Sequence, residues 1–153
     1  MVDVGSKAPE FTLKDSNKQD VSLSSLVGKK PVLLVFYPFA FSGICTGELC
    51  QVRDELAAYE DENVQVIGVS VDTPFSLKAW AAQEGYQFPL LSDFWPHGEV
   101  AKAYGVFNET AGMANRGTFL VDKQGIIRFA EVNEPGQQRD QSAWHRAMAD
   151  LPA

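Results

Sequence analysis

The sequence predicts an α/β protein with a central mixed sheet that is covered by helices on both faces. Two continuous apolar runs, residues 32–37 and 64–71, are rich in β-branched side chains, as buried strands are. Each run is followed by a segment whose apolar residues recur at helical spacing. Strands that alternate with helices favour a largely parallel sheet, and a later hairpin adds antiparallel strands at its edge.

The N-terminal part is expected to form a small β-hairpin. Residues 15–18 are typical of a turn, and Val21 and Leu23 resume an extended pattern after it. Residues 24–28 end in glycine and predict a short helical turn. The first buried strand follows this turn.

A helical pattern begins near Cys45, after the first buried strand stops at Pro38 and a short loop intervenes. The pattern continues to a break at Asn63, and its apolar positions are Leu49, Val52, Leu56 and Tyr59. After the second buried strand, Thr73 fits an N-cap and Pro74 the first helical position. The sequence therefore predicts a second long helix, which Gly85 ends.

The remaining elements are shorter. We expect a strand at 88–91, a helix at 99–104 that Gly105 closes, a hairpin of strands 118–121 and 126–132 around the turn 122–125, and a terminal helix at 140–151. Four apolar residues fall in or beside predicted loops: Phe94, Trp95, Phe107 and Met113. They could form an exposed patch that becomes a dimer interface, or pack locally over the sheet end.

Length and charge narrow the class of protein. A chain of 153 residues suits a single domain spanning 1–153, and 45% hydrophobic residues supply an ordinary core. The formal net charge is −7, and no block of Lys and Arg interrupts it, so nucleic acid and anionic membranes are poor candidate partners. The longest apolar stretch, residues 31–41, is about half of a membrane span, and the N-terminus lacks the pattern of a signal peptide. We expect a cytoplasmic location.

Cys45 is one of only two cysteines, and it lies where the first long helix should begin. Unpaired backbone N–H groups and the positive end of the helix dipole favour a thiolate there, and the thiolate is the nucleophilic form. On count alone, two inert buried cysteines remain an equally good interpretation. A permanent disulfide is disfavoured in a reducing compartment.

Three neighbours of Cys45 have a chemical use at their spacing. Pro38 ends the strand and can shield a thiolate from water, and the Ser42 hydroxyl can bond the thiolate and an incoming oxygen. Glu48, one helical turn after Cys45, makes sense as an anchor for a cation. When Ser42 and Glu48 are considered without the rest of the pattern, ordinary helix capping is the better explanation of both.

Together, Pro-x-x-x-Ser-x-x-Cys at a strand-to-helix junction resembles the active-site signature of the peroxiredoxins, thiol peroxidases with a thioredoxin-like fold. Residues 8–15 look like the N-terminal segment of that family, and residues 115–122 like the segment that carries its essential arginine, here Arg116. Residues 91–98 and 104–109 are similar to the AhpE subgroup. The resemblance implies that Pro38, Ser42, Cys45 and Arg116 form the site and that Glu48 orients Arg116.

The chemistry implied by this resemblance is attack of the Cys45 thiolate on a hydroperoxide, which leaves a sulfenic acid on Cys45. Hydrogen peroxide, alkyl hydroperoxides and peroxynitrite all fit as substrates. The reductant would be thioredoxin, a glutaredoxin-like protein or a low-molecular-weight thiol, and a homodimer is expected. No metal, haem or flavin is required, and His97 and His145 have no metal-ligand spacing with either cysteine.

Cys50 departs from the AhpE pattern. Its spacing, C-x4-C, resembles the bacterioferritin-comigratory (PrxQ-type) peroxiredoxins, whose second cysteine closes an intramolecular disulfide. Cys50 is therefore either a resolving cysteine or a buried free cysteine. In one intact helix the two Cα atoms would lie roughly 8–9 Å apart and point about 140° away from each other, which a disulfide does not tolerate. A resolving role would require residues 44–49 to unwind, which Gly47 makes easier.

Two other functions remain open at this point. A disulfide oxidoreductase on the same fold is disfavoured because the chain has no C-x-x-C pair. A non-catalytic interaction domain would use the aromatic patch instead of the thiols.

Overall fold

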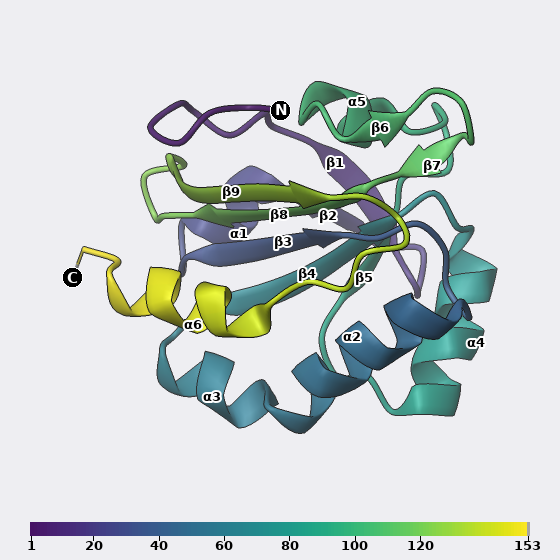
Figure 1. The fold of residues 1–153 in the computed structure, drawn as a ribbon, viewed down its shortest axis with the longest axis horizontal. Coiled ribbons are helices and arrows are strands. Elements are labelled where there is room, and N and C mark those ends of the chain that lie inside the picture. The colour runs from purple at the N-terminus through teal and green to yellow at the C-terminus, as the bar shows by residue number, and fades with distance from the viewer. Residues whose placement is uncertain (153) are drawn as a thin grey trace.

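The computed structural model describes residues 1–152 and has a seven-stranded sheet in the order β2-β1-β5-β4-β3-β8-β9 (Figure 1). The strands of this sheet are β1 (Thr12–Asp15), β2 (Asp20–Ser22), β3 (Val32–Phe36), β4 (Gln65–Ser70), β5 (Leu90–Ser92), β8 (Arg116–Val121) and β9 (Ile127–Asn133). The helices are α1 (Leu23–Val27), α2 (Gly43–Asp54), α3 (Leu56–Asp61), α4 (Pro74–Glu84), α5 (Glu99–Ala103) and α6 (Gln141–Ala149). The expected N-terminal hairpin and mixed sheet are confirmed.

The sheet is parallel only at its centre, so the expectation of a largely parallel sheet was wrong. Strands β3, β4 and β5 pair in parallel. The N-terminal hairpin joins the sheet because β1 pairs antiparallel with β5, and β8 pairs antiparallel with both β3 and β9. Antiparallel strands therefore flank the parallel centre on both sides, which hydrophobic pattern alone does not reveal.

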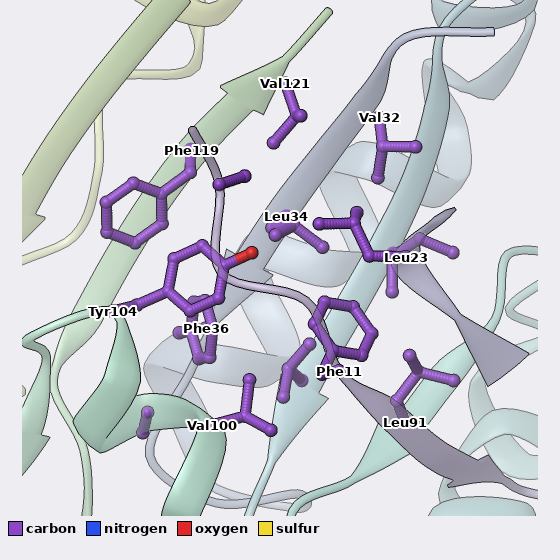
Figure 2. Close-up of a cluster of buried hydrophobic side chains, with 14 of the residues drawn as sticks. Phe11, Leu23, Val32, Leu34, Phe36, Leu91, Val100, Tyr104, Phe119 and Val121 are labelled. Atoms are coloured by element: carbon purple, nitrogen blue, oxygen red, sulfur yellow. The ribbon is translucent and has the colours of Figure 1, made fainter. Parts of the chain in front are cut away.

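Strand β3 divides the core into two clusters because successive side chains point to opposite faces of the sheet. Leu33 and Val35 belong to the cluster under α2, α3, α4 and α6, which lie below the sheet in Figure 1. Val32, Leu34 and Phe36 belong to the cluster on the opposite face, next to α1 and α5. Figure 2 shows the second of these clusters, where the rings of Phe11, Phe36, Tyr104 and Phe119 gather with Leu34 and Val100.

The helical pattern after Cys45 forms two helices rather than one. Glu55 leaves the helical conformation (φ −105°, ψ 15°) and separates α2 from α3. This turn redirects the chain so that Val52 of α2 and Tyr59 of α3 both lie without exposed surface in the same core cluster. The apolar spacing was therefore read correctly, but the break was not predicted.

The second long helix agrees closely with its predicted signals. The Thr73 side chain accepts a hydrogen bond from the Ser76 backbone N–H, Pro74 is the first helical residue, and Gly85 ends α4 in the left-handed conformation (φ 73°). A two-stranded ribbon of β6 (Phe107–Asn108) and β7 (Met113–Ala114) was not predicted, because two-residue strands are too short to show a pattern. Across residues 1–152, no helix has the length and apolar character of a bilayer span.

Candidate active site

The junction between β3 and α2 places Cys45 in the first turn of α2, as predicted from the sequence. Ser42 is the N-cap, and Cys45 is the third helical residue, with no exposed surface. The loop before it is fixed from the turn after β4, because the Ala40 backbone N–H donates to Asp72 Oδ2 at 2.8 Å. Phe41 takes a positive φ of 70°, a conformation uncommon for a large side chain, and its ring packs 6.2 Å from that of Trp80.

Arg116 reaches the Cys45 sulfur from the first residue of β8. Its Nη1 group donates to Cys45 Sγ at 3.2 Å and to Glu48 Oε1 at 2.8 Å, and its Nε donates to the Pro135 carbonyl at 2.8 Å. The Arg116 side chain is only 3% exposed. A permanently charged guanidinium at this distance stabilises negative charge on the sulfur.

Glu48 holds Arg116 together with a second arginine, Arg139. Its Oε1 also accepts from Arg139 Nη2 at 2.9 Å, and its Oε2 accepts from the Arg139 backbone N–H at 2.8 Å and from Arg139 Nε at 3.1 Å. Burial alone would raise the pKa of Glu48. The hydrogen bonds and charge of Arg139, with the charge of Arg116, outweigh burial and hold that pKa below its ordinary value.

Sequence reasoning missed Arg139. It stands just before the terminal helix and beside Asp140, where a charged residue looks like part of a solvated loop. The structure buries it completely: Nη1 donates to the Gly117 carbonyl at 3.0 Å and to Thr118 Oγ1 at 3.1 Å. Nothing in the local sequence marks this role, because the contact with Glu48 joins residues 91 positions apart.

Glu48, Arg116 and Arg139 form what we call the arginine–glutamate cluster. Two guanidinium groups face one carboxylate, so one positive charge is left over beside a buried sulfur. Buried charges are costly unless they are compensated. Negative charge that develops on the Cys45 sulfur would be compensated by this remaining positive charge.

Pro38 and Ser42 lie at the two ends of the loop that leads into α2. The Ser42 hydroxyl donates to the Phe39 carbonyl at 2.8 Å, and within residues 1–152 its side chain makes no capping hydrogen bond. Because its proton points to Phe39, the Ser42 oxygen faces a ligand as an acceptor in this conformation. Pro38 is buried at the end of the strand.

Cys50 lies on the same helix as Cys45 but in different surroundings. Its Sγ donates to Glu84 Oε2 at 3.4 Å and lies 3.5 Å from the Tyr86 hydroxyl. In the part of the chain that the structure describes, both cysteines are free. One thiol therefore faces a guanidinium, and the other faces a carboxylate.

Cys45 lies in the first turn of the helix that follows a central strand, and a guanidinium donates to its sulfur. This arrangement is typical of proteins whose chemistry uses a reactive cysteine. Comparison with known proteins narrows this class. Residues 4–130 match the model of the AhpC/TSA family. The chain is 58% identical over 153 residues to alkyl hydroperoxide reductase E of Mycobacterium tuberculosis, with both chains covered in full.

More distant relatives agree with this match. A chloroplastic 2-Cys peroxiredoxin of Hordeum vulgare is 36% identical over 158 aligned residues, covering 97% of this chain and 74% of the relative. The solved structure of peroxidoxin BcpB from M. tuberculosis superposes with a TM-score of 0.89 at 26% identity, with 100% of each chain covered. AhpC of Enterococcus faecalis gives a TM-score of 0.87 at 31% identity, covering 97% of this chain and 92% of that one.

The chain belongs to the AhpC/TSA family of peroxiredoxins. Its fold is the thioredoxin-like fold of these proteins, and it is a thiol-dependent peroxidase with an antioxidant function. A peroxide is its substrate, and a thiol is its reductant. The peroxidase interpretation of the sequence is confirmed over the disulfide oxidoreductase and the non-catalytic interaction domain.

Proposed function

We propose that Cys45 is the residue of this peroxidase that reacts with the peroxide. The observation that carries the proposal is the 3.2 Å contact of Arg116 Nη1 with a sulfur that has no exposed surface. The Cys45 thiolate attacks the terminal oxygen of a hydroperoxide, the S–O bond forms and the O–O bond breaks. Alkoxide or hydroxide leaves and takes up a proton, and Cys45 becomes a sulfenic acid.

Arg116 and Ser42 are proposed to position the two peroxide oxygens. Arg116 donates to the oxygen that gains negative charge, and the Ser42 oxygen accepts the O–H of the incoming hydroperoxide. Glu48 and Arg139 fix Arg116 from behind, and Pro38 keeps water from the sulfur. Because Cys45 is fully buried, a peroxide can reach its sulfur only if the loop at 39–42 shifts. The side chains of Phe39 and Phe41 in this loop are exposed.

Rapid-mixing kinetics with one equivalent of hydrogen peroxide tests the assignment of Cys45. We expect Cys45→Ser to lose the fast oxidation phase and Cys50→Ser to retain it. Equal loss of that phase in both variants would contradict the assignment, because Cys45 would then have no special reactivity.

Cys50 is proposed to resolve the sulfenic acid by forming a disulfide with Cys45. Both thiols lie on α2, so the bond requires part of that helix to unwind. Glu48 is fixed by the two arginines, its carbonyl accepts from Gln141 Nε2 at 2.9 Å, and Leu49 is fully buried. These contacts oppose unwinding beyond residue 47, so we propose that residues 43–47 unwind, a shorter segment than 44–49.

Intact mass after one equivalent of peroxide tests this resolving role. A disulfide makes the chain about 2 Da lighter, through the loss of two hydrogens. A sulfenic acid that persists, with Cys50 still open to alkylation, would show that Cys50 is structural and that an external thiol reduces Cys45.

We further propose that the protein works as a homodimer. Exposed aromatic side chains follow the carboxyl ends of the three parallel strands, and these ends meet at one edge of the sheet. They are Phe39 and Phe41 after β3, Phe75 after β4, and Phe94 and Trp95 after β5. Trp95, at 79% exposed, is the most open, so Trp95→Glu should convert a dimer to a monomer in light scattering. A wild-type chain that is already monomeric would refute the proposal.

We also propose a location in the cytoplasm and a reductant that depends on the role of Cys50. We propose a single domain spanning 1–153, because strands from both halves of the chain join one seven-stranded sheet. Both cysteines are free within residues 1–152, which fits the reducing cytoplasm. Thioredoxin is favoured if Cys50 closes a disulfide, whereas a glutaredoxin-like protein or a low-molecular-weight thiol suits a persistent sulfenic acid. Turnover measured with each reductant in turn separates these alternatives.

A further inference from the structure

We propose that the Glu84 carboxylate accepts the Cys50 proton when the disulfide with Cys45 closes. This inference rests on the proposed resolving role of Cys50. Cys50 Sγ donates to Glu84 Oε2 at 3.4 Å, a hydrogen-bond length for a sulfur donor. The contact joins the middle of α2 to the last residue of α4, so it aims the thiol proton at a carboxylate before any reaction takes place.

Glu84 is held in place by its neighbours. Arg53 Nη1 donates to the Glu84 backbone carbonyl at 2.7 Å and lies 3.8 Å from Glu84 Oε2. Gln83 Nε2 donates to Glu84 Oε1 at 3.2 Å, and Gly85 ends the helix directly afterwards. The Glu84 side chain is 21% exposed, so a proton that it accepts can pass on to water.

Tyr86 is the other polar group beside Cys50, and it does not suit the role of base. Its hydroxyl donates to the Thr46 carbonyl at 3.3 Å and lies 3.5 Å from Cys50 Sγ. Burial and the hydrogen bond with Cys50 raise the pKa of Tyr86, so it stays a neutral phenol at neutral pH. Glu84 is then the acceptor, and Tyr86 fixes the sulfur.

The same contacts indicate which cysteine moves. Cys50 and Arg53 are both bonded to Glu84, so the C-terminal half of α2 stays docked on α4. The Tyr86 hydroxyl contacts the carbonyl of Thr46, which lies in the turn that unwinds, and this single bond is lost. Cys45 therefore approaches a Cys50 that keeps its carboxylate partner.

Closure of the disulfide consumes the Cys50 thiol and the Cys45 sulfenic acid and releases water. The Cys50 sulfur attacks the Cys45 sulfenic sulfur, the S–S bond forms, and the S–O bond of Cys45 breaks. The Cys50 sulfur is oxidised, and the Cys45 sulfur is reduced. The thiol proton passes to Glu84, and the leaving hydroxide takes up a proton and departs as water. A positioned general base typically contributes at least about a hundredfold to such a proton transfer.

The test follows disulfide formation in the full chain after one equivalent of hydrogen peroxide, by acid quench and intact mass. In Glu84→Gln, we expect sulfenic acid to convert to disulfide about a hundredfold more slowly than in wild type at pH 7. The variant's rate should rise about tenfold per pH unit, because only free thiolate reacts, whereas the wild-type rate should be flatter. Glu84→Asp should restore part of the rate, and Glu60→Gln, on the exposed side of α3, is the matched control.

Each outcome has one interpretation. If Glu84→Gln forms the disulfide at the wild-type rate and pH dependence, or faster, the role of Glu84 is refuted while Cys50 remains the resolving residue. If wild type itself forms no disulfide, the resolving role of Cys50 fails, and the role of Glu84 fails with it.

Discussion

Replacing Glu48 by Gln should destabilise the protein strongly at neutral pH and only weakly in acid. Glu48 accepts hydrogen bonds from two buried arginines, and the side-chain amide of Gln would turn N–H groups toward arginine N–H groups. The shape is kept while the only negative side chain of the arginine–glutamate cluster is removed. The effect therefore reports electrostatics and hydrogen bonding rather than lost packing.

The magnitude follows from the remaining partners. Removing one member of a buried ion pair costs about 3–5 kcal/mol. Arg116 would keep the Pro135 carbonyl, and Arg139 would keep Gly117 and Thr118, which places the cost near the lower end. About 3 kcal/mol corresponds to a fall in Tm of roughly 6–12 °C for a chain of this size.

The pH dependence has a definite sign. The two arginines hold the folded-state pKa of Glu48 below its ordinary value of 4.5, although burial opposes them. A carboxyl group with a lowered folded-state pKa stabilises the fold above its unfolded-state pKa, and this contribution is lost as the pH falls through the folded-state pKa. The difference between wild type and Glu48→Gln should therefore be full at pH 7 and shrink in acid, below the ordinary pKa of a glutamate.

Urea unfolding at several pH values measures this difference. Glu60→Gln on α3 removes an exposed carboxylate and serves as the control, with an expected change within about 0.5 kcal/mol. A Glu48→Gln variant less than about 1 kcal/mol below wild type at pH 7 would refute the reasoning. So would a loss that stays the same in strong acid, because wild-type Glu48 is then itself uncharged.

Three further predictions concern α2 and the arginines that face it. Arg116→Met should lower the rate of Cys45 oxidation by about a hundredfold or more with an unchanged circular dichroism spectrum; a wild-type rate in a folded variant would contradict the role of Arg116. Arg139→Met should lower the unfolding free energy by about 3 kcal/mol in urea titration, since Arg139 is fully buried and bonded to Glu48; a cost typical of a surface residue would show that this pairing is dispensable. Gly47→Ala should stabilise the helix by about 1 kcal/mol, and the added Cβ meets no atom within 4 Å. A more stable helix should slow disulfide formation about fivefold in quench experiments, and an unchanged rate would mean that this turn does not unwind.

The part of the site that depends on neighbouring residues was predictable from the sequence. A strand that stops before Pro38 and a helix that starts in the loop after it fix where Cys45 lies; in the structure β3 ends at Phe36 and α2 starts at Gly43. Glu48 is one helical turn further on, so its place beside Cys45 also follows from helix geometry. Arg116 could be named only through the resemblance to the peroxiredoxins, because its contact with Cys45 spans 71 positions.

The part of the site that depends on tertiary pairing was not predictable. Arg139 pairs with Glu48, and Glu84 pairs with Cys50. The local sequence around Arg139 and around Glu84 looks like that of a surface residue. The same limit applies to the sheet, where local pattern located β1 and β8 but could not show that both pair antiparallel with the central strands. Charged residues that end up buried carry no hydrophobic signal, so their burial appears only when the partners are in place.

Helix α2 gives two cysteines opposite chemical surroundings. Five residues turn the helix by about 140°, so Cys45 points to Arg116 on β8 while Cys50 points to Glu84 at the end of α4. A guanidinium can stabilise negative charge that develops on the Cys45 sulfur, and a carboxylate can accept the proton of the Cys50 thiol in the proposed second step. Glu48 lies between the two and fixes the helix at the point where unwinding should stop. We propose that the charge facing each sulfur sets the order of the two oxidation steps, with Cys45 beside Arg116 oxidised first.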